Sequence, residues 1–565
     1  MRNPGGLPAL ALVAAGLFAW APEASANRPP HIRCATAFFQ EEKEAAARTV
    51  VRPSRGGPSR AVPRKAMTPP PDPSVGDSWN WYIWKLNGPP QAVIRSCTVR
   101  GEGVNCYVVV EDSQWNVNVH QEQVDTILAR FDSHSPGPYP DKGIYDLDTL
   151  AFGPPPDELD NDPKIYILYY DFDVNADGFF WYFDQYPDGT FPYASNECEV
   201  VYINCSDHDV AGDYLLAVVA HEFEHMIHWN MDEDEVAWVD EGCAELAMWL
   251  YGNPDVISGF NTNPHDPLVT WGGAWTDYIQ TYLWTLYFHE RYGGLSSIRR
   301  VVAEWQNSTA GYDAVLSSLG YGVSFTDVFG DWVVANFLDD TTLADGRYGY
   351  VGEDLPSFVA VEHSSYPVGP VNMNVPITAC RYRRLLNGSP MELLFDGSDD
   401  AIWKPRVIEF AGGVPVGVGE IPLDGANAGS VLLPEFGIEH DAIVAAFAHA
   451  SPYGSNAMTF STAWSTGTVP GTGLVVRLDP NAPNPFNPTT EIAFSIERNG
   501  EAALRIYDAS GRLVRTLLDG PVSAGENRAV WDGTGEDGRV LPSGVYMYRL
   551  DADGTSRSRK MTLMR

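Results

Sequence analysis

The segment around His221 constrains the fold more than any other part of this sequence. The residues that precede it, YLLAVVA at positions 214–220, are apolar and helix-prone, and they lead directly into HEFEH at positions 221–225. Apolar residues recur at helical spacing from Ala211 to Leu250. We therefore expect a buried helix that carries ionisable side chains into an apolar interior.

Two histidines of this helix are placed to share a metal ion. Residues four apart lie on one helical face, so His221 and His225 can present two imidazoles to one ion. Zinc takes neutral nitrogen donors, needs a further protein ligand, and keeps an open position for a water whose pKa it lowers toward ~7. Glu222 is the candidate base that takes a proton from this water and passes it to a leaving amine. The five-residue pattern alone also recurs by chance on surface helices.

A second helix-prone segment, VAWVDEGCAE at positions 236–245, supplies the missing ligand. Glu241 is the natural third zinc ligand. Glu245 lies four residues further on the same helical face, where its carboxylate can accept a hydrogen bond from the far nitrogen of a ligand histidine and fix its tautomer. The alternative for Glu245 is a solvated charge on a helix.

Another glutamate of the first helix, Glu224, allows a second interpretation of which residue is the base. The five residues also fit the inverted pattern His-x-x-Glu-His, in which Glu224 rather than Glu222 is the base. We prefer Glu222, because the Glu-Gly-x-x-Glu segment at 241–245 belongs with the direct pattern. For His228 we expect ordinary structural hydrogen bonding.

Peptide hydrolysis also needs a donor for the developing oxyanion, in addition to the metal. Tyr278 and Tyr282, in a helical stretch at 278–292, are the candidates. The alternative is that both are aromatic core residues of an amphipathic helix.

An acidic loop resembles a calcium site. Asp173, Asn175 and Asp177 alternate, Gly178 follows, and Asp184 lies where such loops carry a bidentate Glu. Oxygen ligands at alternate positions and a glycine at the sharp turn are what calcium loops require. A strand rather than a helix precedes this loop, so we expect a structural calcium site, with a solvated acidic turn as the alternative.

The first residues read as an export signal. Residues 1–26 have a basic start, an apolar run from Leu7 to Trp20, and a small-residue pattern that favours cleavage after Ala26. This run and every later one are too short to cross a bilayer, which takes about 20 residues, so we expect no transmembrane anchor. Residues 27–75 are rich in Pro, Arg, Ser and Ala and form a pro-segment or linker. A net charge of −37 argues against binding nucleic acid or anionic membranes.

The 7 cysteines of an exported chain suggest disulfides. By proximity the pairs are Cys97 with Cys106, which would staple a hairpin, and Cys198 with Cys205. Cys34, Cys243 and Cys380 have no assigned partner. The alternative is that all of them are buried small hydrophobes or free thiols.

The length of 565 residues exceeds what one core supports, so several domains are expected. Residues 76–345 alternate strand patterns, such as 164–170, with helical ones, such as 297–304 and 325–337. Residues 346–466 carry short alternating segments with Gly and Pro turns and form an all-β domain. After a linker at 467–480, residues 481–565 have about seven short strands, typical of an immunoglobulin-like sandwich.

The region from His221 to Trp229, together with residues 238–245, resembles secreted bacterial gluzincin-type peptidases of the hyicolysin and immune-inhibitor-A-like kind. The likeness extends over about residues 78–340 and includes the hairpin at 97–106, the strand beginning at 162 and the helix at 278–284. The resemblance implies a zincin-like α+β domain with His221, His225 and Glu241 as zinc ligands and Glu222 as base. Asp240 departs from the Asn common before that Glu.

The last stretch carries a second resemblance. NAPNPFNPTT at 481–490, LRIYD at 504–508, GRLVR at 511–515, WDG at 531–533 and SGVY at 543–546 resemble the sorting domain of type IX secretion cargo and the related flagellar hook-capping fold. This implies passage through the outer-membrane secretion machinery, with release or surface attachment afterwards. The basic end at 557–565 would be recognised by that machinery or be a solvated edge strand.

The sequence thus predicts a secreted or surface zinc endopeptidase that acts on proteins or peptides. It has three parts: an α+β zincin-like domain, an all-β domain and an immunoglobulin-like sandwich. Two alternatives remain: a zinc aminopeptidase, and a cell-surface adhesin with an inactive metallopeptidase fold. An intact Glu222 argues against the adhesin, because a structural zinc site needs no base.

Overall fold

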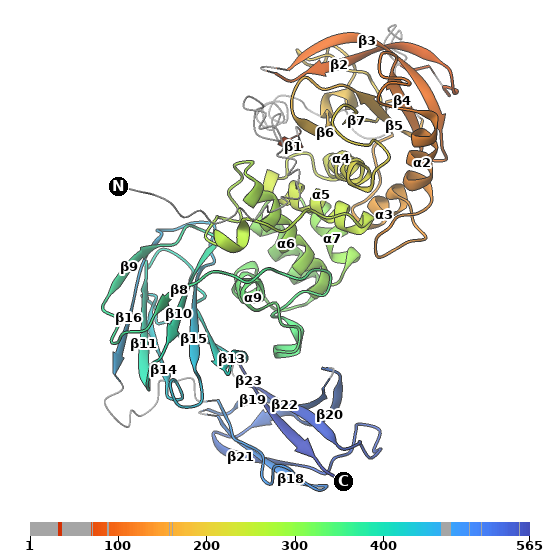
Figure 1. Ribbon diagram of the computed structural model, residues 1–565. Helices are drawn as coiled ribbons and strands as arrows, with labels where there is room; N and C mark the ends of the chain where they lie inside the picture. The colour runs from red at the N-terminus through yellow and green to blue at the C-terminus, as the bar shows by residue number, and fades with distance from the viewer. Residues whose placement is uncertain are drawn as a thin grey trace, which may run out of the picture.

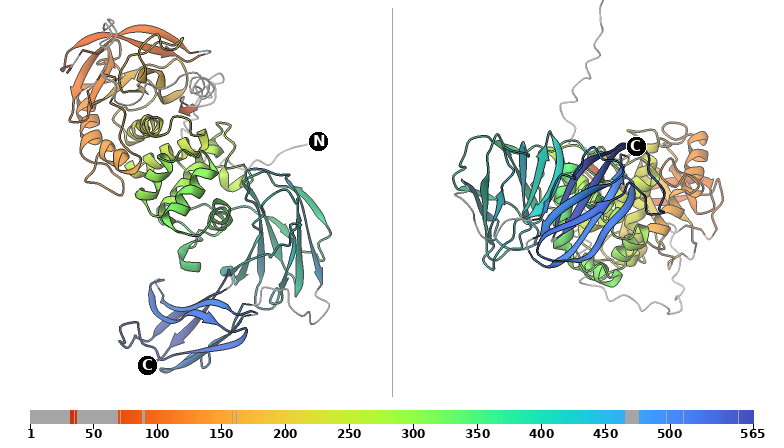
Figure 2. Two further views of the ribbon diagram at one scale, coloured as in Figure 1. Left: turned by 180° about the vertical axis from the view of Figure 1, so that it is seen from behind. Right: turned by 90° about the horizontal axis from the view of Figure 1, so that it is seen from below.

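The structure is a computed structural model that describes residues 32–34, 36, 69–70, 72–87, 90–157, 159–160, 162–464, 476–496, 498–509, 511–552 and 554–565 (Figure 1). The expected signal peptide, most of the expected pro-segment and most of the expected linker lie outside these residues. In the described part, a sheet with covering helices is followed by a helical region and then by two β modules (Figures 1 and 2).

A seven-stranded mixed sheet forms the N-terminal end, in the order β1-β6-β7-β5-β4-β3-β2. Its strands are β1 (Ile32–Cys34), β2 (Ser78–Lys85), β3 (Gln91–Glu102), β4 (Cys106–Glu111), β5 (Ile165–Tyr170), β6 (Ala176–Phe180) and β7 (Val200–Asn204). The parallel strands β4, β5 and β7 lie at its centre and are buried throughout, as continuous apolar runs predict. The expected strand at 164–170 is therefore confirmed as β5.

Helices pack on this sheet and on one another. They are α2 (Gln121–Asp132), α3 (Ile144–Ala151), α4 (Asp213–Met231), α5 (Ala237–Tyr251), α6 (Trp275–Arg291), α7 (Leu295–Val302), α8 (Thr309–Leu319) and α9 (Phe325–Leu338), with short 3-10 turns η2 (Tyr182–Gln185), η3 (Phe260–Thr262) and η4 (Ala344–Gly346). Helix α4 contacts β6 and β7, α5 packs on α4, and α6 packs on α5. The helices expected at 278–292, 297–304 and 325–337 are confirmed as α6, α7 and α9.

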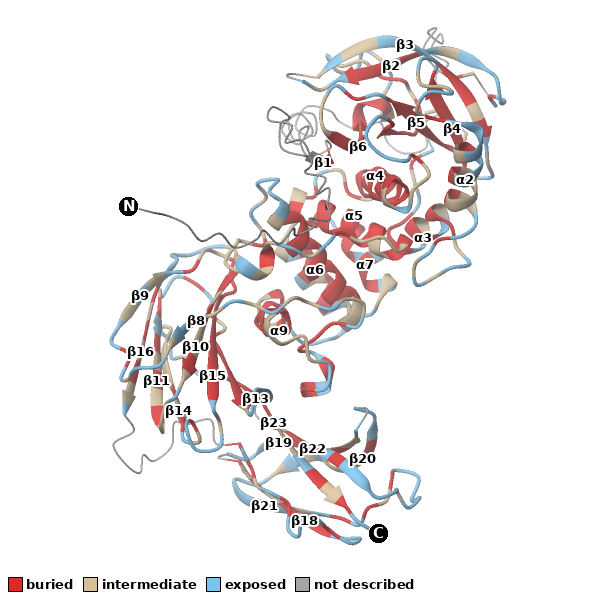
Figure 3. Cartoon of the chain, in the orientation of Figure 1, coloured by how far each residue is buried: buried red, intermediate tan, exposed pale blue. Residues whose placement is uncertain are grey.

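Burial on all sides explains why α4 carries apolar residues on every face. Of its 19 residues, all from Leu215 to Asn230 are buried, because the sheet covers one face and other helices cover the rest (Figure 3). The helix therefore places its three histidines and two glutamates in the protein interior, as the sequence predicts.

Both expected disulfides are wrong, since all seven cysteines are free, buried thiols. Cys97 pairs in register with Glu111, at the far end of β4 from Cys106, which separates the two cysteines by roughly 16 Å. Cys198 and Cys205 flank the extended strand β7 and are at least as far apart. A disulfide requires Cα atoms within about 7 Å. The hairpin of β3 and β4 forms without a disulfide bond.

The middle module, residues 346–464, is all-β, as expected. Its strands are β8 (Val361–His363), β9 (Val371–Asn374), β10 (Ala379–Leu386), β11 (Met391–Gly397), β12 (Arg406–Ala411), β13 (Val414–Glu420), β14 (Ala428–Leu433), β15 (Ala442–His449) and β16 (Ala457–Trp464). Sheet β14-β11-β16-β9 faces the strands β13-β12-β15-β10-β8 across an apolar core. The module rests on α9, where the Tyr382 hydroxyl donates to the Val333 carbonyl at 2.6 Å.

The C-terminal module, residues 476–565, is a two-sheet β-sandwich. Its strands are β17 (Arg477–Leu478), β18 (Thr490–Ile496), β19 (Gly500–Asp508), β20 (Leu513–Val522), β21 (Gly525–Trp531), β22 (Gly544–Ala552) and β23 (Thr555–Leu563). Sheet β17-β18-β21 packs on β20-β19-β22-β23 around its own core.

The last strand of the chain joins the two β modules. Strand β23 pairs with β22 on one side and, at Ser556 and Arg557, with β13 of the middle module on the other. Arg557 forms an ion pair with Glu409, and Arg559 with Glu439 at 2.8 Å. At Ser556 and Arg557 the basic end is therefore not a free edge strand, because β13 covers the start of β23.

Candidate metal centre

Helices α4 and α5 bring the three expected ligands together. The Nε2 atoms of His221 and His225 are 3.2 Å apart. The Glu241 Oε2 atom lies 3.5 Å from the first and 3.8 Å from the second. All three side chains are buried. Because α5 crosses α4 directly, a carboxylate from one helix meets two imidazoles from the other.

The close approach of the helices behind this site depends on a glycine. A Cβ atom added to Gly242, next to Glu241, would lie 2.5 Å from the Thr285 hydroxyl and 3.0 Å from the Thr281 carbonyl of α6. A side chain at this position would collide with α6, so Gly242 allows α5 and α6 to pack closely behind the site.

The ligand set fits a tetrahedral zinc ion. Zinc bonds of about 2.0 to 2.3 Å place neighbouring ligand atoms roughly 3.3 to 3.7 Å apart, close to the separations here. The Oε2 atom of Glu241 is buried without a hydrogen-bond partner. An unpaired carboxylate oxygen in the interior is costly unless a cation meets it.

Carboxylates hold the far side of both imidazoles. The Asp240 Oδ1 atom lies 2.7 Å from Nδ1 of His225, and the Glu245 Oε1 atom lies 3.4 Å from Nδ1 of His221. These contacts orient the rings so that both Nε2 atoms face the centre. The role expected for Glu245 agrees with this placement, whereas sequence reasoning missed the role of Asp240, which it noted only as a departure from Asn.

The neighbouring polar and charged groups raise the pKa of both histidines. Burial alone would lower the pKa of His221, but its contacts with Cys34, Glu241 and Glu245 outweigh burial and raise it. Burial is likewise outweighed for His225, whose pKa the Asp240 carboxylate raises. The pocket is therefore built to hold positive charge among buried carboxylates.

Glu222 lies beside the ligands, against the sheet. A Cβ atom added to Gly178 of β6 would lie 2.8 Å from Cγ of Glu222 and 2.9 Å from Cγ1 of Val218, so the glycine lets α4 approach the strand. Burial raises the pKa of the Glu222 carboxyl. A buried carboxylate with a raised pKa next to the ligands is suited to accept a proton.

Glu224 and His228 lie together on another side of α4. The Glu224 Oε1 atom is 3.1 Å from Nδ1 of His228. Burial raises the pKa of Glu224, while His228 opposes this rise. Glu224 thus lies on the Nδ1 side of His225, at 3.9 Å, and His228 makes the structural hydrogen bond expected of it.

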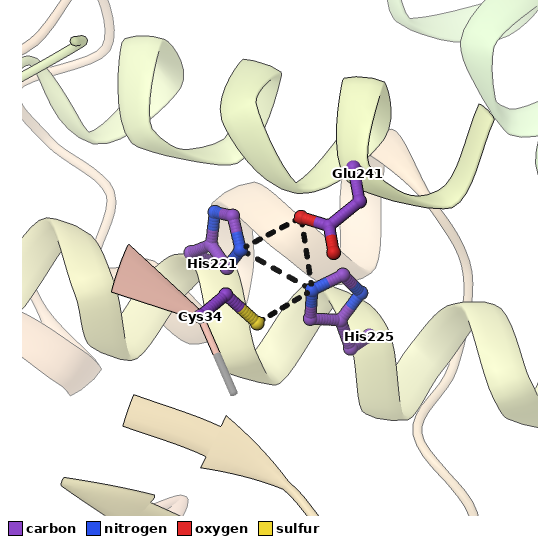
Figure 4. A group of neighbouring side chains, drawn as sticks. All are labelled: Cys34, His221, His225 and Glu241. Atoms are coloured by element: carbon purple, nitrogen blue, oxygen red, sulfur yellow. Dashed lines mark hydrogen bonds and ion pairs between the residues drawn. The ribbon is translucent and has the colours of Figure 1, made fainter. Parts of the chain in front are cut away.

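A fourth donor, Cys34, was not anticipated (Figure 4). Its sulfur lies 3.5 Å from Nε2 of His225 and 3.6 Å from Oε2 of Glu222. The four ligand atoms of Cys34, His221, His225 and Glu241 all lie within 4.8 Å of one another. The only signal in the sequence was an unassigned cysteine in a Pro-rich and Arg-rich segment.

The two candidate tyrosines differ. Tyr278 is buried, its ring packs edge-on against Trp271 at 4.8 Å, and burial followed by the charge of Glu241 raises its pKa. The Tyr282 hydroxyl donates to Glu353 instead. Of the two, Tyr278 is the one that lies in the field of the ligand carboxylate.

The structure does not gather the four expected calcium ligands. Gly178 lies inside strand β6, paired with Cys34 and Ile203, so the expected sharp turn is absent. The carboxylate of Asp173 accepts from the Leu86 amide at 2.7 Å.

The other members of that loop have different partners. Asp177 accepts from Tyr214 at 2.5 Å, and Asp184 accepts from Asn196 at 2.5 Å and Tyr202 at 2.6 Å. Asn175 lies in a bend before β6. Strand β6 begins at Ala176, so Asp177 and Gly178 belong to a strand rather than to the loop that the alternating acidic residues suggested.

Comparison with known proteins assigns only the end of the chain. Residues 483–556 match the FlgD Ig-like domain family, in agreement with the two-sheet C-terminal module. No curated protein matches the chain. Among the described residues, the helices are all too short or too polar to cross a membrane.

Three solved structures share limited segments with the chain. PorZ, described as a surface component of the type IX secretion system of Porphyromonas gingivalis, is 23% identical over 20% of this chain and 14% of its own, with a TM-score of 0.13. FlgD from P. aeruginosa is 20% identical over 16% of this chain and 74% of its own (TM-score 0.12). Latent PorU from P. gingivalis is 16% identical over 37% of this chain and 19% of its own (TM-score 0.15). The chain thus spans a small share of PorZ and PorU, and these likenesses carry no argument about its activity.

Proposed function

We propose that this chain is an exported zinc endopeptidase with a zincin-like catalytic domain. One observation carries the proposal: the metal-binding atoms of His221, His225 and Glu241 converge from two crossing helices, with the Glu222 carboxylate beside them. A purely structural zinc site needs no such base.

His221, His225 and Glu241 would hold the zinc ion. When bound, zinc supplies Lewis acidity that polarises a carbonyl and activates water. Asp240 and Glu245 keep the two imidazoles in orientation through their Nδ1 atoms. Glu222 accepts the proton of the attacking water and returns it to the leaving amine, a role that its raised pKa favours.

The edge of the sheet next to Glu222 supports a peptide as substrate. Strand β6 pairs with β7 on one side, and on its other side it accepts a short extended segment, β1. An extended peptide can add to a sheet edge through its backbone, whatever its side chains. Since Gly178 of β6 lies against Glu222, a peptide bound along β6 passes the base.

Tyr278 is the protein donor we assign to the oxyanion of the transition state. It is buried close enough to Glu241 and Glu222 for their charges to affect its pKa. Tyr282 is assigned a structural role, since its hydroxyl is engaged by Glu353.

Two segments of the chain support the proposal that the protein is exported. Residues 1–26 have the composition of a signal peptide, and residues 483–556 match an Ig-like family whose fold resembles type IX sorting domains. We assign the C-terminal module to recognition by the outer-membrane secretion machinery, which would leave the protein secreted or at the cell surface.

The test is casein digestion by the purified chain lacking residues 1–26. Because Cys34 lies on the site, the Cys34→Ala variant is assayed in parallel. Each protein is assayed with and without a zinc chelator, and the fragments are sequenced. We expect one zinc ion per chain, chelator-sensitive cleavage at internal positions by at least one of the two proteins, and retained zinc but no cleavage in Glu222→Gln.

Each alternative has its own outcome. Release of single residues from the amino end would select an aminopeptidase. A zinc-loaded protein that stays inert even as Cys34→Ala would favour the adhesin and overturn the proposal. Full activity in Glu222→Gln would remove Glu222 from the mechanism.

A further inference from the structure

The segment that carries Cys34 lies across the centre just described. Strand β1 adds to the outer edge of β6 in parallel, with Ile32 opposite Ala176 and Cys34 opposite Gly178. Gly178 is the residue that lies against Glu222. The backbone register therefore delivers the Cys34 side chain to the ligands, where it is only 1% exposed.

The sulfur completes a four-donor shell. It is 3.5 Å from Nε2 of His225, and the donor atoms of Cys34, His221, His225 and Glu241 form one buried group. Figure 4 shows the sulfur approaching from the side of the sheet, opposite the Glu241 carboxylate from α5. Thiolate sulfur is a zinc ligand, with a bond of about 2.3 Å, and four protein ligands make a closed site.

Thr36, two residues after Cys34, also contacts the candidate base Glu222. The Thr36 hydroxyl donates to Oε2 of Glu222 at 3.0 Å, and it accepts from the backbone amide of Phe180 at 2.8 Å. The Glu222 carboxylate, which would accept a proton from water, thus already accepts a hydrogen bond from Thr36. The backbone amide of Phe180, at the end of β6, already donates to Thr36.

We infer that Cys34 is a fourth ligand of the zinc ion and that β1 and Thr36 keep the full-length chain latent. The inference rests on the proposed function and adds regulation of the same site. On binding, the thiol gives its proton to solvent and its sulfur closes the position that catalysis needs open. No other bond forms or breaks, and the site opens when the segment leaves the edge of β6.

The location of the segment in the chain fits this role. Residues 37–68 connect Thr36 to the rest of the described chain and contain several Arg and Lys residues. Cleavage in that connection cuts the covalent link between Thr36 and the rest of the described chain, so that strand pairing, the Thr36 hydrogen bonds and the ligand bond hold the segment in place. Release then uncovers Glu222, the fourth metal position and the edge of β6 together, which are the three features that hydrolysis of a peptide requires.

The test uses cobalt in place of zinc in the chain lacking residues 1–26. Cobalt bound to a thiolate has a sulfur-to-metal charge-transfer band in the near ultraviolet, whereas a shell of imidazole and carboxylate has none. We expect one cobalt ion per chain, lost in His221→Ala, and a charge-transfer band. In Cys34→Ser the band should be lost while the cobalt stays bound. Cys380→Ala, which removes another buried cysteine on β10, should keep the band.

Activity supplies a second measurement. With zinc bound, casein cleavage by Cys34→Ser should exceed that of the unmodified chain and of Cys380→Ala by about tenfold or more, because the fourth position is open. Stoichiometric cobalt without a band in the unmodified chain overturns this inference and leaves the proposed function intact. Failure to bind cobalt or zinc overturns the proposed function and this inference with it.

Discussion

The carboxylate of Asp240 lies 2.7 Å from Nδ1 of His225, and the next residue, Glu241, presents its own carboxylate to Nε2 of the same ring. Two consecutive residues of α5 thus contact opposite nitrogens of one imidazole. The outer contact fixes the ring for the inner one.

Removing the outer carboxylate should therefore weaken metal binding without removing a ligand. We expect Asp240→Ala to lower zinc affinity by about 10 to 100-fold, as loss of such outer partners does. Asp240→Asn, which keeps an oxygen acceptor for Nδ1, should lose much less. Competition with a fluorescent chelator measures both. Equal affinity in Asp240→Ala and the unmodified chain would show that the hydrogen bond does not orient His225.

A methyl group at Gly178 should force α4 away from β6. The added Cβ would lie 2.8 Å from Cγ of Glu222, so Gly178→Ala should cost about 1 to 3 kcal/mol in the free energy of unfolding. Thermal denaturation followed by circular dichroism measures the loss. Gly425→Ala is the matched control, because its added Cβ meets no atom within 4 Å. An equal effect of the two substitutions would contradict the close approach.

The two tyrosines of α6 should differ in catalysis. In the Cys34→Ala background, Tyr278→Phe should lower kcat by roughly 100-fold or more while KM changes little, since an oxyanion donor acts in the transition state. Tyr282→Phe removes a hydroxyl that contacts Glu353 and should leave kcat within a few-fold. The reverse order of effects would assign the donor to Tyr282.

Glu235 should make stability depend on pH. Its buried Oε1 atom accepts from the amides of Val236 and Ser308, and burial, opposed by His228, raises its pKa from 4.5 to about 7. Between those values the unfolded chain loses the proton that the folded chain keeps, so stability falls as pH rises and levels off above about pH 7.

The comparison with Glu235→Gln isolates this contribution. From pH 4.5 to 7 the free energy of unfolding of the unmodified chain should fall relative to the variant by as much as about 3 kcal/mol. Urea denaturation at several pH values measures the difference. A constant difference across this range would mean that Glu235 titrates normally.

The cysteines should all react as thiols. Alkylation of the protein after denaturation, without a reductant and with a chelator present, should modify all seven. Intact mass measures the number added. A mass that shows five alkylated cysteines, with the remaining two linked, would restore one of the disulfides that sequence proximity suggested.

The sequence predicted most residues of the candidate metal centre because they lie on two neighbouring helices. Helical spacing places His221 with His225, and Glu241 with Glu245, on one face of each helix, and the apolar surroundings indicate burial. The contribution of Cys34 could not be found this way. It depends on strand pairing with β6, which lies far along the chain, and no local pattern encodes that partner.

The same physical difference explains the wrong predictions. Acidic residues and a glycine at 173–178 have the local pattern of a calcium loop, but Gly178 pairs with both β1 and β7 inside strand β6. Cys198 and Cys205 are close in sequence, yet the strand between them separates their side chains. Local patterns predicted the helices and strands such as β5, but they failed where the pairing of distant strands decided the conformation.

The pairing of β23 with β13 sets a temporal order for folding. The sheet that begins at β8 and runs through the middle module continues across β23 into the C-terminal module. Its connecting strand, β23, follows every other described strand of both modules along the chain. Because a ribosome makes the chain from its amino end, β23 emerges after the strands that it joins, so this sheet can close only once both modules have otherwise been synthesised.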